Sequence, residues 1–228
     1  MTSPDPVHSS LLTKQTRTRA KAEPRWPAIL ALAALAGLYE SLPERLTPGP
    51  NWILPVAIAV LLVPTILAHR AQSHRTYFAM GVLLNLIITV AVIWSLGILI
   101  AGLPDKREAP TELLRSAVAL WVSNVLVFAS WYWRLDAGGP LRRDLRDAHT
   151  KGAFLFPQMT FPPDSPLAEL GWKPGFVDYL FLAFNTSTAF SPTDVPVLSR
   201  WAKLLMMVQS CVSLGTIAIL AARAINIL

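Results

Sequence analysis

Two long apolar segments, residues 77–103 and 201–228, constrain the fold of this chain more than any other feature. A helix of about 20 apolar residues is long enough to cross a hydrocarbon core about 30 Å thick, and both segments exceed that length. Only 15% of the residues are charged, whereas soluble domains carry about 25%. The sequence therefore predicts an integral membrane protein whose first partner is the lipid bilayer.

Three further apolar segments, at residues 26–42, 52–68 and 113–133, bring the predicted number of long spans to five. Tryptophan and tyrosine side chains favour the two membrane–water interfaces. Such residues stand near the ends of the segments: Trp26, Trp52, Tyr77, Trp131, Tyr132, Trp133 and Trp201. We predict an all-α, polytopic transmembrane helical bundle with five long spans plus one short helix and a polar loop.

The net charge of +6 is concentrated in clusters that flank the apolar segments. Basic loops favour the cytoplasmic side of a membrane, so we expect the N-terminal tail and the connections at residues 69–76 and 134–173 to be cytoplasmic. This pattern predicts a multi-pass protein of the cytoplasmic membrane with a cytoplasmic N-terminus. It also argues against nucleic-acid binding, because orientation during insertion explains the basic clusters.

The composition divides the chain into four regions. Residues 1–24 form a polar, basic tail that we expect to be disordered. Residues 25–134 form a four-helix transmembrane region, and residues 135–175 form a long connection that we expect to be cytoplasmic. Residues 176–228 contain a short apolar helix, a polar loop and a final transmembrane helix.

The short apolar segment of residues 176–190 leaves the topology open. Its 15 residues would rise about 22 Å as a helix, which is short of a full crossing. If the segment crosses the membrane, Leu228 lies inside. If it dips into the membrane and returns, there are five spans and Leu228 lies outside. A crossing is slightly favoured, because it places every basic cluster inside, including Arg223.

Polar residues recur on one face of the last apolar segment. Gln209, Ser213 and Thr216 fall at positions i, i+4 and i+7, which lie on one side of a helix. Because polar groups in lipid are costly without partners, these residues are expected to face protein or water. Two interpretations stay open, namely a helix–helix interface and the lining of a pore or cavity.

Residues 185–194 read Asn-Thr-Ser-Thr-Ala-Phe-Ser-Pro-Thr-Asp and stand shortly before the final helix. The region of residues 176–228 resembles the pore loop and inner helix of potassium channels, in which a pore helix ends in a Thr-x-Thr-like stretch. The resemblance implies a homo-oligomer, with four subunits around one axis, and small ions as partners. The pore loop that it implies contains Thr186, Thr188, Ser191, Pro192, Thr193 and Asp194, and the lining below it contains Gln209, Ser213 and Thr216.

The stretch that would form a potassium filter departs from the family pattern. Ser191-Pro192-Thr193 stands where the family has Gly-Tyr-Gly. A filter presents rings of backbone carbonyls to the ion. Glycine permits the dihedral angles that this arrangement needs, whereas proline fixes its own φ. A potassium selectivity filter is therefore not expected.

The whole chain is also similar to a group of uncharacterised bacterial integral membrane proteins with four N-terminal spans. The shared features are an aromatic end to the fourth span at residues 131–133, an Asp-Tyr-Leu segment at residues 178–180 and a Thr-x-Phe-x-x-x-Asp-Val loop at residues 188–195. An Asn-x-Leu C-terminus at residues 226–228 completes the similarity. The group has no settled biochemistry that could be transferred to this chain.

Residue patterns typical of enzymes and cofactor sites do not occur in the sequence. There is no Gly-rich phosphate loop, no His-Glu-x-x-His and no Gly-x-Ser-x-Gly, and the single cysteine, Cys211, excludes an intrachain disulfide. We therefore expect no enzymatic activity, metal or other cofactor. The leading hypothesis is a channel-like protein with Asp194 at its mouth. The alternative is a non-conducting scaffold or interaction protein that keeps a channel-derived fold.

Overall fold

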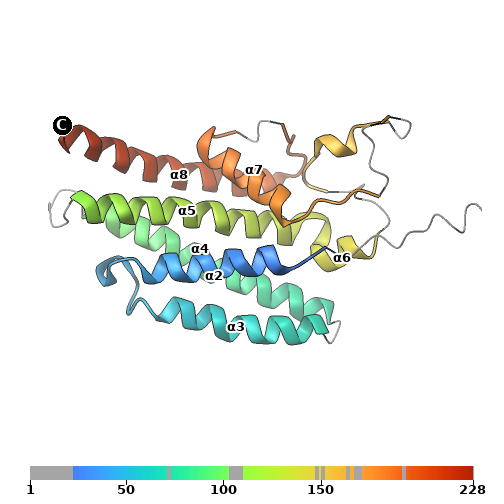
Figure 1. Ribbon diagram of the computed structural model, residues 1–228, viewed down its shortest axis with the longest axis horizontal. Coiled ribbons are helices and arrows are strands. Elements are labelled where there is room, and N and C mark those ends of the chain that lie inside the picture. Colours follow the sequence, from blue (N-terminus) through green and yellow to red (C-terminus); the bar gives the residue numbers. More distant parts are fainter. Residues whose placement is uncertain are drawn as a thin grey trace, which may run out of the picture.

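The computed structural model describes residues 23–70, 73–102, 110–146, 149, 152–162, 165–166, 171–191 and 194–227. The α-helices in this part of the chain are α2 (Trp26–Glu40), α3 (Ile53–Arg70), α4 (His74–Ala101), α5 (Pro110–Leu135), α6 (Pro140–Asp144), α7 (Phe176–Thr188) and α8 (Arg200–Ile227). The long helices lie side by side along the long axis of the molecule (Figure 1). The predicted all-α fold is confirmed for the described residues.

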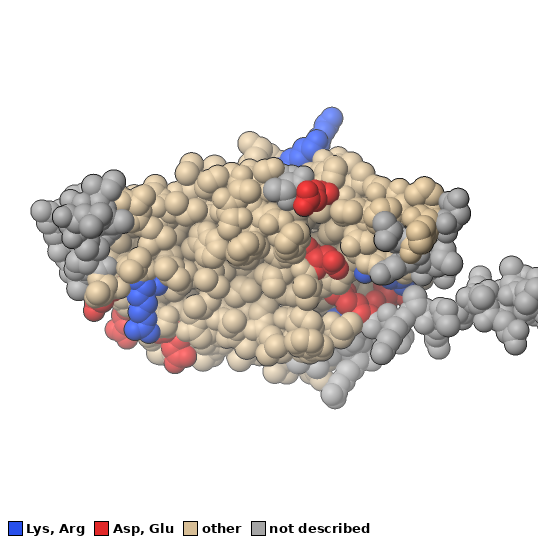
Figure 2. Space-filling model, turned by 45° about the horizontal axis from the view of Figure 1, so that its top comes forward, with Lys and Arg blue, Asp and Glu red and all other residues tan. Residues whose placement is uncertain are grey.

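Three helices are long and apolar enough to cross a membrane, over Arg75–Ala101, Thr111–Gly138 and Arg200–Ala222. The apolar helices Trp26–Glu40 and Ile53–Thr65 are shorter, so the prediction of five long spans is not confirmed. On the face in Figure 2, charged side chains lie toward the two ends of the bundle and leave a broad uncharged band between them. Such a band is what a bilayer core requires of a protein surface.

Helix α5 is the centre of the bundle, because α2, α4, α7 and α8 all pack against it. Its serines at positions 116, 123 and 130 recur every seven residues, and each is at most 3% exposed. Small side chains at this spacing allow neighbouring helices to approach closely. The fully buried Leu120, Phe128 and Tyr132 fill the space between them.

A tight turn follows α5 and reverses the chain. Ala137, Gly138 and Gly139 have φ angles of 52°, 83° and 90°, and glycine adopts such left-handed angles without the steric cost that a side chain brings. The short helix η2 (Asp136–Gly138) and helix α6 follow directly. We call this end of the bundle, where α6 lies, the α6 end.

Helix α7 enters the bundle from the α6 end, and the chain then returns to that end. Phe154 packs against Tyr179 near the start of α7 and against Trp201 at the start of α8, with ring centroids 6.1 Å apart in both pairs. Leu198 N also donates a hydrogen bond of 2.7 Å to Ala153 O. Helices α7 and α8 therefore start at the same end of the bundle.

Helix α8 runs the length of the bundle away from the α6 end (Figure 1). The start of α7 and α8 at the same end is the arrangement that the re-entrant alternative expects, while both membrane topologies stay predictions. The 13 residues of α7 rise about 20 Å, less than a hydrocarbon core of about 30 Å.

Candidate functional site

Two of the predicted site residues, Gln209 and Ser213, lie in a polar network where α5, α7 and α8 meet. Gln209 is fully buried. Its Nε2 donates hydrogen bonds to Ala183 O at 2.7 Å and to Ser187 Oγ at 2.8 Å, both on α7. Its Oε1 accepts a hydrogen bond from the Tyr132 hydroxyl on α5. The amide of Gln209 is thus occupied on both sides by neighbouring helices.

Ser213 extends this network by one turn along α8. Its hydroxyl donates to Ser187 O at 2.6 Å and accepts from Trp121 Nε1 on α5 at 3.1 Å. Asn124 of α5 donates through Nδ2 to Gln209 O at 3.2 Å. Each of the three helices therefore contributes polar groups to one continuous buried network, which we call the α7 anchor.

The α7 anchor satisfies backbone groups that a helix ending inside a membrane would leave unpaired. The last four carbonyls of a helix have no intrahelical donor, and an unsatisfied carbonyl in hydrocarbon costs several kcal/mol. Ser187 O belongs to the last turn of α7 and receives its hydrogen bond from Ser213. The polar stripe of α8 therefore holds the end of α7 inside the bundle.

Three of the predicted site threonines, at positions 186, 188 and 216, bond their own helices. The hydroxyls of Thr216 and Thr186 are buried, and each donates at 2.8 Å to the carbonyl four residues earlier. The hydroxyl of Thr188 is exposed and donates in the same way at 3.0 Å. These hydroxyls are satisfied without water or an ion.

The predicted pore-loop residues that follow α7 lie in a different environment. Ser191 and Asp194 are exposed, whereas Gln209 and Ser213 are fully buried. Pro192 and Thr193 lie outside the described residues. Phe190, directly before this stretch, has a φ of 53°. Residues other than glycine and asparagine rarely adopt such a positive backbone angle.

A second buried polar cluster lies at the α6 end, and the sequence did not single it out. It centres on Asp136, which is fully buried. Asp136 accepts hydrogen bonds from the Tyr179 hydroxyl at 2.6 Å and from Ala153 N. The His149 Nε2 atom lies 3.1 Å from Asp136 Oδ2. This carboxylate joins the end of α5, the start of α7 and the connection between them.

Arg143 of α6 is the cation of this cluster. Its guanidinium donates to Trp133 O at 2.7 Å and to Asp136 O at 3.1 Å, so it satisfies carbonyls at the C-terminal end of α5. It also lies over the Tyr179 ring, 5.0 Å from the centroid. Arg143 thereby fixes the turn that follows α5.

Glu23 ties the chain before α2 to the same cluster. Its carboxylate accepts from Trp133 Nε1 at 2.7 Å and from Phe176 N at 2.6 Å, and Arg143 Nη2 lies 3.3 Å away. Arg25 pairs with Glu23 at 2.9 Å and also with Asp144. We call this arrangement around Asp136, Arg143 and Glu23 the N-terminal clasp.

Most polar groups of these two networks bond other segments of the chain, while Asn124 Oδ1, Arg143 Nε and His149 Nδ1 are buried without a hydrogen-bond partner. In the described part of the chain, no group of three or more His, Cys, Asp or Glu side chains is placed to hold a metal ion. The carboxylates of Glu23, Asp136 and Asp144 all accept hydrogen bonds from neighbouring segments. Both networks therefore hold helices in place.

No protein-family model matches this chain, and neither a curated protein nor a solved structure matches it.

Proposed function

We propose that the protein is a non-conducting, multi-pass membrane scaffold or interaction protein with a channel-like re-entrant helix. The observation that carries this proposal is the α7 anchor, in which Gln209 and Ser213 direct their polar atoms at α7 and α5. Residues that line a conducting pore must offer polar atoms to ions or water. Here the same atoms are used within one subunit.

The outward face of α8 supports the same proposal. Leu204, Met207, Val208 and Leu214 on this face are between 42% and 63% exposed. A surface of this kind suits contact with lipid tails or with apolar helices of another protein. If subunits assembled through this face, the contact would be apolar, which fits a homo-oligomeric scaffold better than a hydrated pore.

We further propose that the α6 end faces the cytoplasm. Its exposed charges include the cations Arg142, Arg146 and Lys203. At the other end the exposed acids Glu44 and Glu112 stand beside the exposed cations Arg45 and Arg115. Cytoplasmic ends of membrane proteins carry an excess of Lys and Arg. In this orientation the re-entrant path of α7 leaves the C-terminal end of α8 on the outer side.

A second candidate function is ion conduction. The observation in its favour is that α7 enters from one end and the chain returns to that end, which is the path that channel pore loops take. Asp194 is exposed on the returning segment, where it could attract cations. Under this candidate, several subunits would bring Asp194 together at a mouth.

Ion flux from the purified protein in liposomes tests the two candidates. We expect no release of trapped potassium or chloride above that of protein-free vesicles, while an added ionophore empties the same vesicles and proves that they hold a gradient. The mass of the protein in detergent gives the number of subunits. Flux that changes with Asp194→Asn but not with Glu44→Gln would instead establish a channel.

A further inference from the structure

Helix α6 and the turn that continues it have one side that the N-terminal clasp does not use. Pro140 and Arg143 are buried against the bundle. Arg142, Leu145 and Arg146 are exposed. Their spacing of i, i+3 and i+4 places these three residues on one side of a helix. The helical turn reaches the last of them, because Arg146 N donates a hydrogen bond of 3.1 Å to Arg143 O. We call these three exposed residues the α6 face.

The α6 face lies at the level where the apolar surface of α2 begins. Arg25 directly precedes Trp26, the first residue of α2. The Arg25 guanidinium pairs with Asp144, which directly precedes Leu145. Trp26 is 62% exposed and Leu145 is 83% exposed. Because exposed tryptophan collects at the boundary between hydrocarbon and water, the ion pair places Leu145 beside that boundary.

The tight turn after α5 keeps α6 at this level. The left-handed backbone angles of residues 137–139 reverse the chain directly after α5, and Figure 1 shows α6 next to the start of α2. A Cβ atom at Gly138 would lie 2.6 Å from Cδ of Arg142, so the stem of Arg142 lies over the turn. The face is therefore held by the end of a possible membrane span.

The two arginines of the α6 face carry charge that the described part of the chain does not neutralise. Neither Arg142 nor Arg146 forms an ion pair with a described residue. The acid between them, Asp144, is already occupied, since it accepts a hydrogen bond of 3.1 Å from Glu23 N and pairs with Arg25. Exposed cations beside an apolar side chain at a membrane boundary are complementary to anionic lipid head groups.

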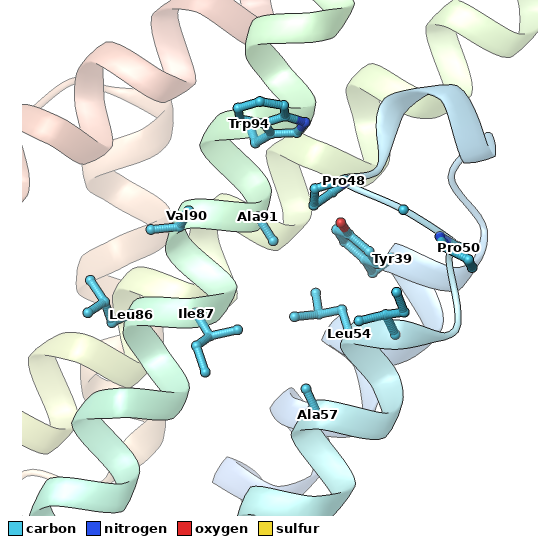
Figure 3. A pocket seen from close by; sticks show the side chains of 12 residues that line it. Tyr39, Pro48, Pro50, Leu54, Ala57, Leu86, Ile87, Val90, Ala91 and Trp94 are labelled. Carbon is cyan, nitrogen blue, oxygen red and sulfur yellow. The ribbon is translucent and has the colours of Figure 1, made fainter.

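A pocket of about 420 Å³ between α3 and α4 is a contrasting surface of the same bundle. Tyr39, Leu54, Leu86 and Trp94 are among the side chains that line it (Figure 3). None of the described residues that line this pocket is charged. An uncharged surface contacts lipid tails of every kind and does not distinguish one head group from another.

We propose that the α6 face binds the head groups of anionic phospholipids in the leaflet at this end of the bundle. Leu145 inserts among the first carbons of the acyl chains, and Arg142 and Arg146 donate hydrogen bonds to phosphate oxygens. Arginine suits this role, because its planar guanidinium donates two parallel hydrogen bonds to one phosphate. The proposal depends on the placement of the bundle in a membrane, and it is independent of whether the protein conducts ions.

The test uses the full-length protein in nanodiscs with equal amounts of phosphatidylglycerol and phosphatidylcholine. Native mass spectrometry of the released protein counts the bound molecules of each lipid. One Arg near an anionic surface strengthens the attraction on the order of fivefold. We expect phosphatidylglycerol to be enriched on the wild type, and Arg142→Gln with Arg146→Gln to lower that enrichment at least fivefold.

The matched control removes two exposed cations from the other end of the bundle, through Arg45→Gln with Arg115→Gln. These cations stand beside the exposed acids Glu44 and Glu112, so the control should change the enrichment less than twofold. Salt gives a second measurement on the unchanged protein. At about 1 M salt the Debye length is about 3 Å, and the enrichment should fall.

The depth of Leu145 is measured separately with a spin label at Leu145→Cys, in a background with Cys211→Ser. We expect dissolved oxygen to relax this label more than a water-soluble nickel chelate does, and the reverse for a label at Glu44→Cys. Equal enrichment in the arginine variant and its control, or an enrichment that salt does not change, overturns the proposal. A label at position 145 that lies in water also overturns it and makes an acidic protein the partner of the two arginines.

Discussion

Gln209 shows at the scale of one residue why a polar side chain is stable inside this bundle. It bonds Ala183 O, Ser187 Oγ and the Tyr132 hydroxyl, and it has no exposed surface. Replacing it by leucine keeps the volume similar but leaves these partners without their hydrogen bonds. Buried polar groups that lose their partners cost about 1–3 kcal/mol.

We therefore expect Gln209→Leu to lower the free energy of unfolding by about 1–3 kcal/mol. A thermal unfolding series in detergent measures the change. Met207→Leu, at a 63% exposed position of the same helix, is the matched control and should behave like the wild type. Equal unfolding temperatures for the two variants would contradict a structural role for the α7 anchor.

The residue scale also shows what the sequence could and could not predict about the candidate site. Helical spacing predicted that Gln209 and Ser213 share a face, since that depends only on the period of a helix. Their partner Ser187 could not be found in this way, because it depends on α7 ending inside the bundle. Glu23 and Asp136 resemble solvated acids in sequence, and their contacts come from segments far away along the chain.

Helix α7 is the element whose ending determines the path of the chain. Its C-cap is Ala189, with a φ of −94°, and the next residue is Phe190, with a φ of 53°. Helices commonly end with a residue in this left-handed conformation, and glycine is the usual choice because a side chain there costs about 1–2 kcal/mol. The backbone is therefore strained at Phe190, where the chain turns back.

We expect Phe190→Gly to raise the free energy of unfolding by about 1 kcal/mol, because it removes the steric cost of a left-handed residue with a side chain. Ala189→Gly is the control, since its negative φ offers no such relief and glycine adds backbone entropy in the unfolded state. Chemical unfolding in mixed micelles compares the two. A loss of stability in Phe190→Gly as large as that in Ala189→Gly would show that packing of the exposed ring outweighs the strain.

At the scale of elements, the apolar periodicity predicted where helices lie but not how α7 would be placed. The length of α7 is compatible with a short crossing and with a return. The choice is made by contacts between segments, such as the hydrogen bond from Leu198 N to Ala153 O. The residues of α7 take no part in that hydrogen bond, so the sequence of α7 alone does not predict it. Five long spans are not confirmed, since α2 has only 15 residues and three helices in the described part of the chain are long and apolar enough to cross a membrane.

At the scale of the whole molecule, charged side chains gather at both ends of the bundle, on opposite sides of the uncharged band. If the α6 end is cytoplasmic, a cysteine at Arg146 should react with a membrane-impermeant maleimide only in opened cells, and a cysteine at Glu44 should react in intact ones. Both positions are exposed. The background carries Cys211→Ser, which removes the natural thiol. Labelling of both cysteines from the same side would contradict a bundle with α6 and the Glu44 turn at opposite ends.

The N-terminal clasp imposes an order of events during biosynthesis. Glu23 accepts its hydrogen bond from the backbone of Phe176, 153 residues further along. At about 5–20 residues per second, the ribosome needs about 8–30 s to make the second partner after the first. Glu23 can therefore pair with its near neighbour Arg25 at once, whereas its bond to Phe176 forms only after most of the chain has been translated. A chain truncated before α7 lacks the hydrogen bond from Phe176 N but keeps the contacts of Glu23 with Trp133 and Arg143.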